Sequence, residues 1–136
     1  MPSTPRARAT LTAVTLVALC AVLVTAARAA SVLDFDVWMR AIDKRSVDVQ
    51  KNIEAHRTDA AIADAQELAR LYGLMETYFV DDGRTPDAVT LSQSGKALAA
   101  GIPASLAAQD FDGAAKSALE IAHACNDCHD NHKPFQ

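Results

Sequence analysis

Apolar residues recur at steps of three and four along most of this chain, which is the spacing of one face of an α-helix. The first stripe runs from about residue 32 to residue 56, and the second follows Thr58 or Asp59, either of which can cap a helix. The stripes comprise Phe35, Trp38, Met39, Ile42, Val49 and Ile53, and then Ile62, Ala65, Leu68, Tyr72, Met75 and Phe79.

The second helix is predicted to end before residues 81–83, and Pro86 follows in an expected loop. Residues 89–106 suit a third helix less well. Gly95 and Gly101 lower its helix propensity, and Pro103 is expected to kink the helix or to split it.

The fourth helix is expected from about Asp110 or Phe111 to His132. Four helices with short links and no strand signal predict an all-α fold, an antiparallel four-helix bundle formed by one domain at residues 30–136. The predicted inner face of the fourth helix carries Phe111, Ala115, Ala118, Leu119, Ala122, Cys125 and His129.

Residues 1–29 have the organisation of a signal peptide. They combine a basic start, an uncharged apolar run, and the small residues Ala27 and Ala29 at the positions that a signal peptidase recognises. The run is short for a membrane span, although a retained N-terminal anchor is the alternative. Leu19 before Cys20 is too large for the usual lipid-attachment signal. We therefore expect a periplasmic protein without stable membrane insertion after cleavage.

Cleavage would make the chain more acidic. The full sequence has 13 basic and 17 acidic residues, and three arginines of the leader would be lost, which leaves 10 against 17 and a net charge of −7. Such a charge disfavours nucleic acid and anionic membrane surfaces as partners. It suits a redox partner with a basic docking patch.

The strongest chemical signal is the sequence Cys125-Asn126-Asp127-Cys128-His129, which has the spacing of a c-type haem attachment site. On a helix, two cysteines three residues apart share a face, so both sulfurs can reach the vinyl groups on one edge of a porphyrin. His129 can then donate a ring nitrogen to the iron. Export agrees with this interpretation, because bacteria attach such a haem outside the cytoplasm.

Three other chemistries could use the same residues. A redox dithiol of the thioredoxin type requires a strand-to-helix context that is not seen here. A zinc site made of Cys125, Cys128, His129 and His132 would take all four ligands from about two turns of one helix, which cannot surround a tetrahedral ion. A disulfide between the two cysteines would close a very small, strained loop.

Residues 112–115 and 125–130 of the last helix follow the pattern of class II cytochromes c, the cytochrome c-prime family, and a generic resemblance extends over about residues 32–135. The resemblance implies a four-helix bundle with one covalently attached haem c and its iron. The family's distal position in the first helix corresponds to Met39, where methionine binds the iron and leucine leaves it five-coordinate. Family members often dimerise through their first two helices, which leaves a homodimer among the expected assemblies.

Bundle geometry supports Met39 independently, because the start of the first helix lies beside the end of the fourth. Met75 is the competitor, since the second helix runs back toward the same end. His56 lies about 25 Å farther along the first helix and is not an expected ligand, and neither is His123. Either methionine could instead serve only as core filler.

We therefore expect an exported monohaem c-type cytochrome that carries single electrons between redox proteins and is not an enzyme. Its iron would be held by His129 and Met39. The alternative is a five-coordinate haem protein that binds NO or CO, which requires Met39 to be displaced or merely packed. A peroxidase would require a distal acid–base histidine, and none is expected at that end of the first helix.

Overall fold

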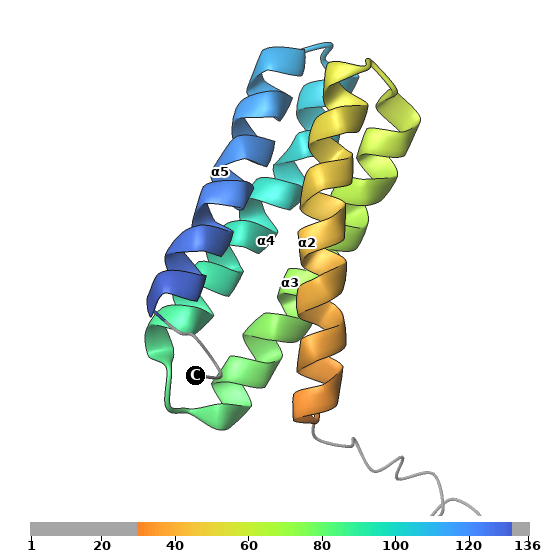
Figure 1. Cartoon of the computed structure of the whole chain (residues 1–136). Helices are drawn as coiled ribbons and strands as arrows, with labels where there is room; N and C mark the ends of the chain where they lie inside the picture. The colour runs from red at the N-terminus through yellow and green to blue at the C-terminus, as the bar shows by residue number, and fades with distance from the viewer. Residues whose placement is uncertain (1–29, 132–136) are drawn as a thin grey trace, which may run out of the picture.

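The structure of the chain, a computed structural model, describes residues 30–131 and consists of four helices without a strand in that range. The predicted leader and His132 lie outside the described residues. The prediction of an all-α chain is confirmed over the described part. The helices, drawn in Figure 1, are α2 (Val32–Glu54), α3 (Thr58–Asp82), α4 (Pro86–Ala107) and α5 (Phe111–Asn131).

The helices pack as a closed ring in which each contacts two neighbours: α2 on α3, α3 on α4, α4 on α5, and α5 back on α2. In Figure 1 the chain ascends through α2 and α4 and descends through α3 and α5. The start of α2, the α3–α4 turn and the end of α5 therefore lie at one end of the bundle, which we call the α3–α4 end. None of the described helices has the length and apolar character needed to span a membrane.

Local sequence explains where the helices begin and end. At the start of α2, the Asp34 carboxylate accepts a hydrogen bond from the Ser31 backbone N–H at 2.8 Å, while the Ser31 hydroxyl accepts one from the Asp34 N–H. Helix α3 ends at Gly83, whose φ of +67° is the left-handed conformation that glycine adopts without a steric penalty. Pro86 was expected in a loop but is the first residue of α4, where a missing N–H costs no hydrogen bond.

The expected cap of α3 is wrong, and α4 is not split at its proline. Thr58 is already helical, and the residue before it, Arg57, makes no capping hydrogen bond with its side chain. Helix α4 runs without interruption through Pro103. The proline removes one backbone donor, but Ile102 and Leu106 on either side of it are almost fully buried and hold that segment against the core.

The inner face of α5 also differs from the prediction. Ala114, Ala118 and Ile121 are fully buried, whereas Ala115 is exposed and Leu119 is 51% exposed. The buried positions alternate steps of four and three, as a helix packed along a bundle requires. The predicted inner face combined residues of this buried row with residues of the adjacent, exposed row.

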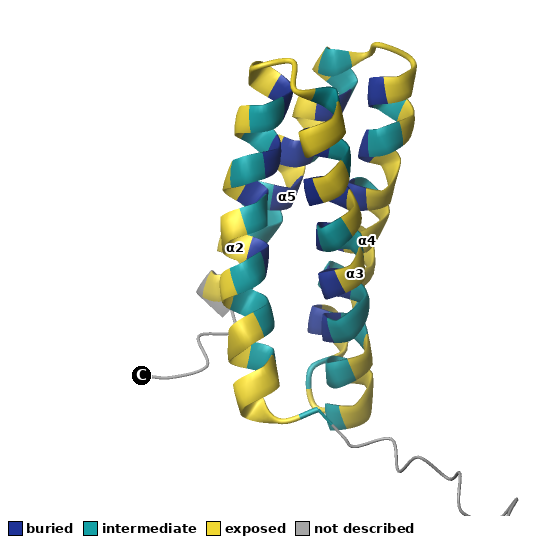
Figure 2. Cartoon of the chain, turned by 90° about the vertical axis from the view of Figure 1, so that its right-hand side faces the viewer, coloured by how far each residue is buried: buried dark blue, intermediate teal, exposed yellow. Residues whose placement is uncertain are grey.

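Burial is uneven along the bundle axis. None of the residues at 32–41 of α2, 76–82 of α3 or 122–129 of α5 is buried, although all three segments belong to the α3–α4 end. In Figure 2 the buried residues gather in the middle and upper turns. Helix α4 differs, because Ala88 and Ser92 in its first turns are buried. The core is therefore incomplete at the α3–α4 end along α2, α3 and α5.

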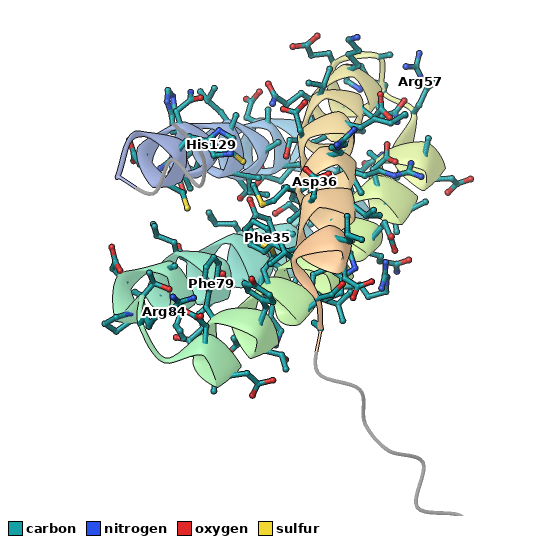
Figure 3. The ribbon with its side chains drawn as sticks, turned by 60° about the horizontal axis from the view of Figure 1, so that its bottom comes forward. Phe35, Asp36, Arg57, Phe79, Arg84 and His129 are labelled. Atoms are coloured by element: carbon teal, nitrogen blue, oxygen red, sulfur yellow. The ribbon has the colours of Figure 1, made fainter. Side chains whose placement is uncertain are left out.

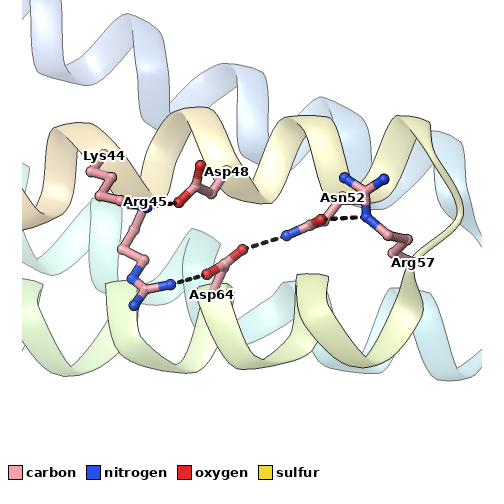
Figure 4. Close-up of polar contacts among 6 residues, drawn as sticks. All are labelled: Lys44, Arg45, Asp48, Asn52, Arg57 and Asp64. Atoms are coloured by element: carbon pink, nitrogen blue, oxygen red, sulfur yellow. Dashed lines mark hydrogen bonds and ion pairs between the residues drawn. The ribbon is translucent and has the colours of Figure 1, made fainter.

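A polar network joins α2 to α3 away from the α3–α4 end (Figure 4). The carboxylate of Asp64, only 5% exposed, accepts hydrogen bonds from Arg45 Nη1 at 2.5 Å and from Asn52 Nδ2 at 2.6 Å. Arg57 Nε donates to Asn52 Oδ1 at 2.8 Å. Because the buried carboxylate has partners on both oxygens, it fixes the alignment of the two helices instead of leaving an unpaired buried charge.

Candidate functional site

A small apolar cavity of about 30 Å³, partly open to solvent, lies where all four helices approach the α3–α4 end. Four of its lining residues carry sulfur: Met39 from α2, Met75 from α3, and Cys125 and Cys128 from α5. The other lining residues are Ile42, Tyr72, Phe79, Leu91, Ser92 and Ala124.

The two cysteines face this cavity because they occupy the same face of α5. They lie three residues apart, and each is partly buried as a free thiol. His129 follows Cys128 by one residue and is therefore turned about 100° around the helix. It is exposed and does not line the cavity. In Figure 3, which looks toward the α3–α4 end, His129 lies on the last turns of α5.

The two methionines differ in their burial. Met75 is only 4% exposed and belongs to the core, whereas Met39 is partly buried and packs against the edge of the core. Both reach the cavity that the cysteines line. The structure thus brings Met39 to the position expected of it, and brings Met75 to the same place.

Tyr72 of α3 spans the wall of the cavity. Its hydroxyl oxygen lies 3.5 Å from the sulfur of Cys125, within hydrogen-bonding distance of a sulfur atom. Its ring lies against Gly95 of α4, where a Cβ atom would stand only 2.5 Å from the ring carbon Cε1. The glycine that lowers the helix propensity of α4 is therefore what makes room for Tyr72.

Burial controls the ionisation of two of the lining groups. The pKa of the Tyr72 hydroxyl is raised, first by burial and then by the neighbouring Cys125. Burial also raises the pKa of the Cys128 thiol, with smaller contributions from Cys125 and Asp87. Both groups are therefore neutral at physiological pH, and no charged side chain lines the cavity.

Aromatic rings pack beside the cavity, between α2 and α3. The centroid of the Phe35 ring lies 4.8 Å from that of Tyr78 and 5.6 Å from that of Phe79, and Phe79 itself lines the cavity. Figure 3 labels Phe35 and Phe79 at this end of the molecule. The rings provide a wide apolar wall, which a flat hydrophobic ligand would require.

The remaining described histidines lie elsewhere. His56 is in the α2–α3 turn at the opposite end, where its ring centroid is 4.3 Å from that of Phe111, and His123 is exposed on α5. Within the described residues, no three His, Cys, Asp or Glu side chains are grouped so that they could hold a metal ion. His132, the fourth ligand of the zinc alternative, lies outside them.

The sequence did not reveal Gly95, Leu91 or Ser92 as parts of the site. Tyr72 was expected as bundle core or haem-pocket wall, and Gly95 only as a weakness in α4. Their contact joins residues 23 positions apart on different helices, so periodicity along one helix carries no sign of it. A glycine inside an otherwise apolar helical stripe is the one signal that could have indicated a close approach.

No model of a known protein family matches the chain, and no curated protein or solved structure is significantly similar to it.

Proposed function

We propose that this protein is an exported monohaem c-type cytochrome, an antiparallel four-helix bundle that carries single electrons between redox proteins. The observation that supports the proposal is the cavity at the α3–α4 end, where both cysteines of the attachment sequence meet the thioether of Met39. Met39 and the two cysteines, at least 86 positions apart in the sequence, line the same cavity. The bundle alone does not require a methionine opposite this cysteine pair.

The side chains present suit a haem. In the proposal, the sulfurs of Cys125 and Cys128 form thioether bonds to the two vinyl groups on one porphyrin edge. His129 and Met39 provide the nitrogen and the sulfur that bind the iron, and a bound haem would supply exchange between its ferrous and ferric states. The exposure of His129 in the haem-free chain means that its imidazole must turn toward the cavity on attachment.

The apolar lining has its own role in such a carrier. Aromatic and aliphatic side chains exclude water from the iron, and a methionine ligand favours the ferrous state. With no charged group along the cavity wall, the reduction potential would be set mainly by the two ligands and by burial.

The test is the absorption spectrum of the protein made in a host that matures c-type cytochromes. The proposal expects a haem retained after denaturation, which shows covalent attachment, and low-spin bands with a weak red band from methionine-to-iron charge transfer. Met39→Leu should convert the spectrum to high-spin and allow CO to bind the iron. Met75→Leu, which changes a thioether lining the same cavity, is the matched control and should stay low-spin.

Each other outcome corrects a specific part of the proposal. A low-spin spectrum that is kept in Met39→Leu but lost in Met75→Leu would indicate that Met75 of α3 binds the iron in place of Met39. High-spin bands in the unmutated protein would favour the gas-binding alternative. Absence of any retained haem would refute both haem functions.

A further inference from the structure

Four sulfur-containing residues from three different helices line a single cavity, and this arrangement does not depend on haem. Met39 comes from α2, Met75 from α3, and Cys125 and Cys128 from α5. A metal site made only of α5 residues could not surround an ion, because all of its ligands would lie on one side of that ion. Donors that come from three helices can surround an ion.

We propose that the chain without haem binds one copper(I) ion in this cavity, through the thiolates of Cys125 and Cys128 and the thioethers of Met39 and Met75. Thiolate and thioether are the soft ligands that select copper(I). The inference goes beyond the proposed function, because it concerns the free thiols of the chain before any haem is attached.

The rest of the lining disfavours the competing metals. Carboxylate groups are absent from the residues that line the cavity, and the imidazole of the adjacent His129 is exposed and does not line it. Thioethers are not among the usual zinc ligands, so the two methionines add affinity for copper(I) alone. The apolar walls also limit access of water to the ion.

The side chains can adjust to the ion at little cost. Methionine has three rotatable bonds and adapts to irregular surroundings. The Tyr72 hydroxyl lies 3.5 Å from the Cys125 sulfur, within hydrogen-bonding distance. Binding releases the two thiol protons to solvent and transfers no electron.

The site and the haem compete for the same atoms. Once Cys125 and Cys128 have formed thioether bonds, their sulfurs carry no negative charge and copper(I) loses its two strongest ligands. The haem-loaded protein should therefore bind no copper in this cavity, and copper(I) should slow haem attachment to the free chain.

The test uses the full chain exported in a host that lacks the machinery for c-type haem attachment. All variants carry Cys20→Ser, so that Cys125 and Cys128 are the only thiols. Copper(I) is titrated without oxygen against a coloured copper(I) chelator of known affinity. We expect one ion per chain, at least tenfold weaker binding in Met39→Leu and in Met75→Leu, and loss of the site in Cys125→Ser. His123→Ala removes a copper-binding side chain of α5 outside the cavity and should leave the affinity unchanged.

Methionine-to-leucine changes conserve volume, and circular dichroism confirms that each variant is helical before titration. Full copper affinity in either methionine variant would overturn the four-sulfur site and leave a simple dithiol. No binding by the parent chain would overturn it entirely. X-ray absorption of the complex provides a second measurement, which must show sulfur as the only neighbour of copper. Failure of this proposal leaves the haem spectrum unaffected, so the two proposals are tested separately.

Discussion

The contact between Tyr72 and Gly95 gives the sharpest test of the structure. An alanine Cβ at position 95 would stand 2.5 Å from Cε1, 2.6 Å from Cζ and 2.9 Å from Cδ1 of the Tyr72 ring. Carbon atoms normally approach to about 3.5–4.0 Å, so the ring would have to retreat by roughly 1 Å. Gly101, on the same helix, has no atom within 4 Å of the equivalent position, and Gly101→Ala is therefore a matched control.

Only one of the two substitutions should stabilise the protein. Alanine in place of glycine within a helix contributes about 1 kcal/mol, and Gly101→Ala should raise the free energy of unfolding by about that amount. At position 95 the same gain opposes an overpacking cost of about 1–3 kcal/mol, so Gly95→Ala should leave the free energy of unfolding unchanged or lower it by up to about 2 kcal/mol.

Urea denaturation of the haem-free chain, followed by circular dichroism, measures both changes. Comparable m-values would show that the midpoints report stability and not a change in the unfolded state. A second readout is the thiol of Cys125, which should lose its contact with the Tyr72 hydroxyl when the ring moves and so react faster with iodoacetamide. If Gly95→Ala proves as stabilising as Gly101→Ala, the proposed packing of Tyr72 against α4 is wrong.

Two further predictions concern buried polar groups in the haem-free chain. The hydroxyl of Ser46 is buried without a hydrogen-bond partner, so Ser46→Ala should raise the free energy of unfolding by about 1 kcal/mol in the same urea assay, and a loss of stability would indicate an unseen partner. The raised pKa values of Cys128 and Tyr72 mean that the unfolded chain releases these protons first, near about pH 8.5 and pH 10 respectively. The contribution of these two groups to stability should therefore be constant below about pH 8 and fall as the pH rises through that window, with a smaller fall above pH 10 in Tyr72→Phe. Urea midpoints independent of pH from 7 to 11 would contradict the burial of both groups.

The four helices could be predicted because each has a long apolar stripe and a recognisable end. Gly83 and the turn residues around it mark the end of α3, for example. The failures have physical causes as well. Pro103 was given its usual effect on an isolated helix, but burial of the neighbouring Ile102 and Leu106 outweighs one missing hydrogen bond. The inner face of α5 was wrongly predicted because alanine is common on both the buried and the exposed face of this helix.

The site was predictable in its chemistry but not in its walls. The spacing of Cys125 and Cys128 puts both on one face of a helix, and the alternating direction of the helices brings Met39 to the same end. The sequence favoured Met39 over Met75 as the ligand, and the structure does not separate the two, because both lie at that end and both line the cavity. The Tyr72–Gly95 contact depends on the relative rotation of α3 and α4, which no pattern within one helix contains.

On the proposed function, the uneven burial along the bundle would let the cell distinguish haem-loaded from haem-free molecules. In the haem-free chain, the segments 32–41, 76–82 and 122–129 form helices without a single buried side chain, so they open at low cost. On the proposed function, the haem would supply the apolar surface that these segments lack. A protease outside the cytoplasm would then degrade chains that failed to receive a haem and spare the others, which makes the incomplete end of the core a quality-control signal.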